Sequence, residues 1–207
     1  LDGPSYPVRI DLPGALYSAY LDFTWSPWFT PQLGAELGVK LGVFSDFTTV
    51  TSDSVRFPTL AAGVVRLTPT TSAKLGVAYI DRNDIKLLPV AGIVWDPSPQ
   101  KHWEIVFPYP KLACYATTTG NTQVWWYIGA EYGGGAWTYN RVDNGASDQV
   151  DINDLRVFIG VDWFNLNRWH GFAEIGYVFN REIVDVLRPE DSTDLEDTIM
   201  IRAGIHF

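Results

Sequence analysis

Charged side chains at alternate positions of otherwise apolar segments are the residues with the clearest chemical potential in this chain. Between Gln32 and Val43 every odd-numbered position is apolar, whereas the even-numbered positions carry Gln32, three glycines, Glu36 and Lys40. A two-residue period is typical of a β-strand with one apolar and one polar face. An acid and a base on the same polar face predict ion pairs that line or fill an interior.

Three histidines and one cysteine are the other residues that could perform chemistry. His102, His170 and His206 are not accompanied by a nucleophile motif such as G-x-S-x-G. Cys114 is the only cysteine, so no intramolecular disulfide can form, and its apolar neighbours favour an inert packed thiol. We therefore expect no enzymatic activity, no cofactor and no metal site.

The composition narrows the class of protein. A formal net charge of −9 with only 15 Lys and Arg residues argues against a nucleic-acid partner. Hydrophobic residues make up 46% of the chain, but no run approaches the roughly 20 apolar residues of a transmembrane helix. Residues 1–5 do not resemble a signal peptide, so we expect the mature part of a longer precursor.

The elements that position these side chains are predicted to be β-strands throughout, because no segment shows sustained helical periodicity. No long linker divides the chain, so we expect residues 1–207 to form one domain. Prolines near 13 and at 108 and 110 also allow a count of ten strands. The preferred count is twelve, near 5–12, 15–25, 32–45, 57–67, 73–81, 87–95, 101–107, 111–118, 123–139, 150–164, 169–185 and 197–207.

The connections between these strands alternate in kind. Short turns rich in Pro, Ser, Thr and Asn are expected near 26–31, 68–72, 96–100, 119–122 and 165–168. Longer acidic loops are expected around 46–56, 140–149 and 186–196. Short turns at one end and long loops at the other are typical of an antiparallel up-and-down barrel in a membrane.

The last strand carries the most specific signal. From Thr198 to Phe207, the apolar residues Ile199, Ile201, Ala203, Ile205 and Phe207 share one face. A closing strand of this kind with a final aromatic residue resembles those of Gram-negative outer-membrane β-barrels. The resemblance, to uncharacterised porin-like barrels, implies an outer-membrane location, contact with lipid and lipopolysaccharide, and a role for Phe207 as the assembly signal for the insertion machinery.

Aromatic residues agree with a membrane location. They make up 14% of the chain, and several tryptophans lie close to the predicted short turns. Tryptophan favours the membrane–water interface, where its apolar ring and its polar N–H are both satisfied. We expect an aromatic girdle formed by Trp25, Trp28, Trp95, Trp103, Trp163 and Trp169.

The polar faces of the strands should line the lumen. A Lys or Arg facing lipid near the midplane would cost roughly 2–4 kcal/mol, so charges within strands are expected to point inward. Glycines on the same faces leave room for bulky aromatic neighbours. The expected lumen-lining residues are Glu36, Lys40, Lys74, Glu104, Trp125, Tyr127, Glu131, Arg156, Asp162, Glu174 and Arg202.

The leading functional prediction is a small porin-like channel that transports small polar solutes passively. The second is a closed barrel with a structural or scaffolding role in the outer membrane, as part of a homo-oligomer or envelope assembly. The third is a soluble lipocalin-like barrel, which would place its apolar faces around a ligand cavity. Charged ladders along the lumen are compatible with either an open path or a filled interior.

Overall fold

The computed structural model describes residues 13–48, 50–141, 145–165, 169–185 and 193–206. These residues form an all-β structure in which the single helical element is the short 3₁₀ turn η1 (Ser52–Ser54). Within the same residues, no helix is long and apolar enough to cross a membrane. The strands are β1 (Tyr17–Trp25), β2 (Leu33–Ser45), β3 (Val55–Arg56), β4 (Thr59–Thr68), β5 (Thr71–Tyr79), β6 (Leu87–Ser98), β7 (Lys101–Phe107), β8 (Lys111–Thr119), β9 (Thr122–Asn140), β10 (Ser147–Asn165), β11 (His170–Asp185), β12 (Thr193–Leu195) and β13 (Thr198–His206).

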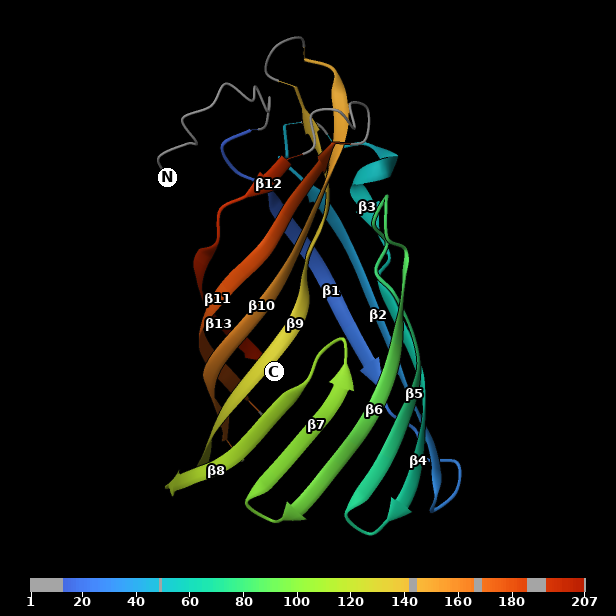
Figure 1. Ribbon diagram of the computed structural model, residues 1–207, viewed down its shortest axis with the longest axis vertical. Coiled ribbons are helices and arrows are strands. Elements are labelled where there is room, and N and C mark those ends of the chain that lie inside the picture. The colour runs from blue at the N-terminus through green and yellow to red at the C-terminus, as the bar shows by residue number, and fades with distance from the viewer. Residues whose placement is uncertain (1–12, 49, 142–144, 166–168, 186–192, 207) are drawn as a thin grey trace.

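The strands form one curled sheet in which each long strand pairs antiparallel with the next along the chain (Figure 1). A parallel bridge between Ser45 of β2 and Thr138 of β9 closes a ring of seven strands, β2 and β4 to β9. Strand β1 continues the sheet beyond β2, while β10, β11 and β13 continue it beyond β9. The prediction of an all-β barrel is confirmed.

The two ends of the barrel differ in their connections. Tight connections such as Pro69–Thr70, Pro99–Gln100 and Gly120–Asn121 lie at one end, which we call the short-turn end (Figure 1). The opposite long-loop end holds η1 and the connection at 80–86 between β5 and β6. One exception to the alternation is the β7–β8 connection at 108–110, which is short although it points toward the long-loop end.

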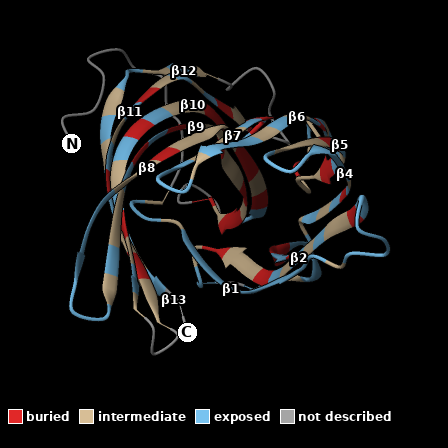
Figure 2. Cartoon of the chain, turned by 90° about the horizontal axis from the view of Figure 1, so that it is seen from below, coloured by how far each residue is buried: buried red, intermediate tan, exposed pale blue. Residues whose placement is uncertain are grey.

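The free edges of the sheet are β1 and β13, which lie on the same side of the barrel (Figure 2). Strand β1 runs toward the short-turn end, and so does β13, because its last residue His206 pairs with His170 at the start of β11. Both edges therefore run in the same direction. Apart from the very short β3 and β12, the described residues form eleven strands. The predicted strand 5–12 lies outside the described residues, so the count of twelve stays a prediction.

The two faces of the sheet differ in character. Large apolar side chains cover the convex face, where Leu75 is 73% exposed and Ile201 is 79% exposed. The concave face is polar and tightly packed: a Cβ atom added at Gly160 would lie 2.5 Å from the ring of Tyr127. This contact follows the prediction that glycines accommodate bulky neighbours.

Candidate functional site

Ion pairs follow the concave face across strands that are not neighbours. Lys74 of β5 donates to Glu36 of β2 at 2.7 Å, and its Nζ lies 3.9 Å from Glu104 of β7. Each contact passes over one intervening strand, and curvature shortens the distance between side chains on a concave face. The predicted alternation therefore places these three charges together inside the barrel.

A second network lies on β9, β10, β11 and β13. Glu131 accepts bonds from Arg156 at 3.0 Å and from Arg202 at 2.8 Å. Arg202 also pairs with Glu174, which in turn accepts a 2.6 Å bond from the hydroxyl of Tyr127. Arginine is suited to such a network because its planar guanidinium donates several hydrogen bonds at once.

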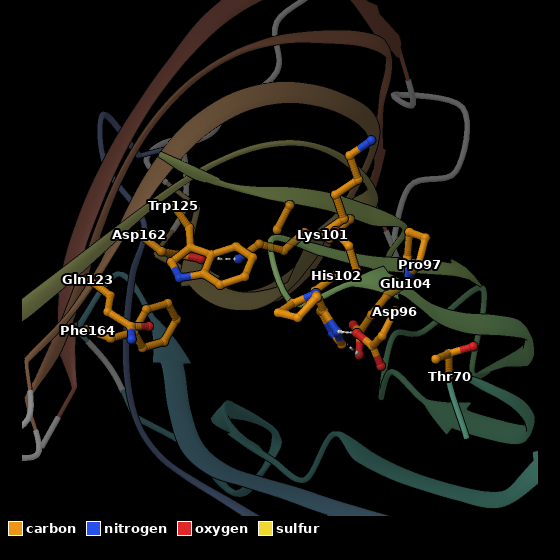
Figure 3. Close-up of a pocket in the computed structure, with 14 residues that line it drawn as sticks. Thr70, Asp96, Pro97, Lys101, His102, Glu104, Gln123, Trp125, Asp162 and Phe164 are labelled. Carbon is orange, nitrogen blue, oxygen red and sulfur yellow. Dashed lines mark hydrogen bonds and ion pairs between the residues drawn. The ribbon is translucent and has the colours of Figure 1, made fainter. Parts of the chain in front are cut away.

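A cavity of about 830 Å³, which we call the vestibule pocket, opens at the short-turn end (Figure 3). Strands β6 to β10, the β6–β7 turn and Thr70 of the β4–β5 turn supply its lining. Lys111 and Asp162 form a 2.5 Å ion pair in the lining, and the ammonium of Lys111 lies 3.8 Å from the centre of the Tyr127 ring. The ammonium of Lys111 compensates the charge of the buried Asp162 carboxylate. Burial of that carboxylate without a partner would be costly.

The opposite wall of the vestibule pocket carries a histidine between two carboxylates. Nδ1 of His102 lies 2.6 Å from Asp96, and its Nε2 lies 3.7 Å from Glu104. Figure 3 shows this cluster facing the side chains of Trp125 and Phe164. Within the described ranges, no group of three or more His, Cys, Asp or Glu residues could hold a metal ion.

The long-loop end is constricted by the β5–β6 connection. Arg82 of this connection is 4% exposed and donates to Asn153 Oδ1 of β10 and to the Gly133 carbonyl of β9, both at 2.7 Å. Its guanidinium also lies 4.7 Å from the ring centre of Tyr132. Burial lowers the pKa of Arg82, while nearby phenols and carboxylates act in the opposite direction. Arginine nevertheless stays charged at neutral pH.

Further contacts join residues at the long-loop end to the same two strands, β9 and β10. Buried Asp151 of β10 accepts bonds from the Asn83 backbone N–H and side-chain amide, both at 2.7 Å. Arg56 of β3 donates to Gln149 at 2.9 Å. The Ser54 and Thr138 hydroxyls lie 2.5 Å apart, next to the bridge that joins β2 to β9. The long-loop end of the barrel is therefore narrow and filled with buried polar groups.

Strand β9 has an irregular backbone conformation at Gly134, which we call the bend in β9. Gly134 has φ +98°, and a Cβ atom there would lie 1.8 Å from the Ile152 carbonyl oxygen. Beyond the bend, Tyr139 is buried and donates to Asp185 at 3.0 Å, while Arg141 pairs with Asp185 at 2.7 Å and with Asp148. The extended ends of β9 to β11 thus form a small core of their own.

The predicted lumen-lining residues lie on described strands, and most belong to the networks above. Lys40 pairs instead with Asp22 of β1 at 3.5 Å, and Trp125 lines the vestibule pocket. Their role in a lumen stays a prediction. The complete predicted set is Glu36, Lys40, Lys74, Glu104, Trp125, Tyr127, Glu131, Arg156, Asp162, Glu174 and Arg202.

The predicted girdle tryptophans lie next to the short-turn end of their strands or in the turns themselves. The rings of Trp95 and Trp103 contact each other edge to face at 5.0 Å. Their position at a membrane interface stays a prediction. Phe207, the predicted assembly signal, lies outside the described residues.

The structure adds residues that sequence reasoning missed. Arg82 was missed because a strand pattern does not predict the position of side chains in a connection. Asp151 was missed because the pattern does not predict which segments from distant parts of the chain contact each other. His102 and Asp96 lie on either side of the β6–β7 turn, and their proximity could have been inferred from that hairpin.

Comparisons with known proteins add no relative. No protein-family model matches the chain, and neither the curated proteins nor the solved structures contain a significant match.

Proposed function

We propose that this chain is an outer-membrane β-barrel whose lumen is closed at the long-loop end, with a structural or scaffolding role in the envelope. A membrane location is supported by the broad apolar convex face, which water would solvate poorly, and by the polar concave face. The closing strand adds its resemblance to outer-membrane barrels.

The observation that carries the closed lumen is the set of buried contacts between the β5–β6 connection and β9 and β10. Arg82 and Asp151 make these contacts with almost no exposure to solvent. Separating a buried charge from its hydrogen-bond partner costs free energy, because each group is then left without compensation. An ion would therefore meet a stable barrier at this end.

A narrow channel is the second candidate function. Its support is the vestibule pocket at the short-turn end and the charged concave wall, which together suit the passage of a small polar solute. In this alternative the contacts of the β5–β6 connection would have to open.

Single-channel recording of the refolded protein in a planar bilayer tests both candidates. We expect no steady conductance from the parent protein and openings from an Arg82→Ala, Asp151→Ala double variant. Arg66→Ala is the matched control, because Arg66 is exposed near the short-turn end and contacts Trp28. Circular dichroism checks that each variant is folded.

Two results would overturn the closed-barrel proposal. Steady conductance of the parent, with ion selectivity that shifts in a Glu36→Gln, Lys40→Gln double variant, would establish the channel instead. A folded Arg82→Ala, Asp151→Ala variant that remains silent would show that these contacts are not the barrier.

A further inference from the structure

The vestibule pocket has the size of a small-molecule site. Its volume of about 830 Å³ lies within the roughly 300–1,000 Å³ typical of ligand pockets. It lies at the end of the barrel opposite to the constriction, so a ligand could occupy it whether or not the lumen conducts ions.

One wall of the pocket is aromatic and polar at once. Trp125 of β9 and Phe164 of β10 lie on this wall with Gln123 (Figure 3). Tyr115 contacts the Trp125 ring edge to face at 5.7 Å, which restricts the orientation of the indole. The wall therefore presents a flat apolar surface beside an amide that can both donate and accept hydrogen bonds.

On the facing wall, and in the lining between the two walls, acidic side chains lie next to basic ones. His102 lies between Asp96 and Glu104, and Lys111 pairs with Asp162. The carboxylates oppose binding of an anion such as phosphate, and their cationic partners oppose binding of a free cation. An acyl chain would cover these groups without offering them a hydrogen bond.

We propose that the vestibule pocket binds a neutral saccharide. The C–H face of a sugar ring would stack on Trp125, and its hydroxyls would bond to the Lys111–Asp162 pair and to the His102 cluster. A hydroxyl suits such pairs because it donates to a carboxylate and accepts from an ammonium group. A neutral saccharide combines the absence of net charge with an apolar ring face and several hydroxyls, which matches the two walls of the pocket.

Titration calorimetry tests this assignment with protein folded in a detergent that has no sugar headgroup. The probes are maltotriose, cellotriose and chitobiose, with inorganic phosphate and choline as charged comparisons. We expect at least one saccharide to bind and Trp125→Ala to weaken its binding at least tenfold. Trp126→Ala is the matched control, because the neighbouring Trp126 is 51% exposed and does not line the pocket.

A second variant covers the case in which Trp125→Ala does not fold. His102→Gln removes the imidazole between Asp96 and Glu104 at a partly exposed position, and it should also weaken saccharide binding. Absence of binding by all three saccharides would overturn the assignment. So would tighter binding of phosphate or choline, or equal losses in Trp125→Ala and Trp126→Ala.

Discussion

A single arginine on the convex face tests whether this barrel is solvated by lipid. Leu75 is at the centre of β5, is 73% exposed, and lies opposite Gly63 and Ala91 of the neighbouring strands. Its neighbour Lys74 is buried on the concave face. Leu75→Arg therefore adds a charge to the face that is proposed to contact hydrocarbon, with no close packing partner to displace.

The expected cost follows from depth in the bilayer. An arginine near the midplane destabilises a membrane barrel by roughly 2–4 kcal/mol, whereas near the interface the cost falls to about 0–1 kcal/mol. The first range corresponds to a change of about 30- to 700-fold in the unfolding equilibrium, since 1.4 kcal/mol is about tenfold. In water, an exposed substitution of this kind would change stability by only about 0.5 kcal/mol in either direction.

Guanidinium unfolding of the protein in phosphatidylcholine vesicles measures this free energy, and the fluorescence of its nine tryptophans reports the transition. Leu67→Arg is the control, because Leu67 is 59% exposed on the same strand face as Val65 but lies beside the short turn after β4. If Leu75→Arg costs less than about 0.5 kcal/mol, or no more than Leu67→Arg, the inference that the convex face meets lipid is wrong.

Two further predictions concern the barrel wall. If the predicted strand 5–12 runs antiparallel between the two edges and a four-residue loop joins it to β1, Val8 would lie opposite Leu21. The test uses a Cys114→Ser background, in which a Val8→Cys, Leu21→Cys variant should form an intramolecular disulfide on oxidation. A Val8→Cys, Tyr20→Cys variant should not form one. The reverse result, or only intermolecular disulfides, would contradict the twelve-strand count. Gly134→Ala should destabilise the protein by more than about 1 kcal/mol, because φ of +98° is unfavourable for alanine and its Cβ would collide with the Ile152 carbonyl. If the same unfolding assay shows no change in stability, the bend in β9 does not require glycine at position 134.

The sequence by itself determined the strands and the two faces of the sheet. The two-residue period of Leu33 to Val43 follows from the pleat of a single strand, so no knowledge of neighbours is needed to separate its apolar and polar sides. Turns such as Pro69–Thr70 are likewise encoded locally, by residues that favour tight reversal of the chain. These local signals were sufficient to predict the class of fold and the positions of the eleven longer strands within the described residues, whereas the short β3 and β12 lie in segments predicted to be loops.

Only the tertiary structure decided which polar groups meet. The pairs Glu131–Arg202 and Lys111–Asp162 join strands that are not neighbours, so they depend on the curvature of the whole sheet. Arg82 is in a connection without periodicity, and its burial depends on the approach of that connection to Gly133 of β9 and Asn153 of β10. The vestibule pocket and the constriction both arise from contacts between residues far apart in sequence, because alternation specifies the direction of a side chain but not its partner.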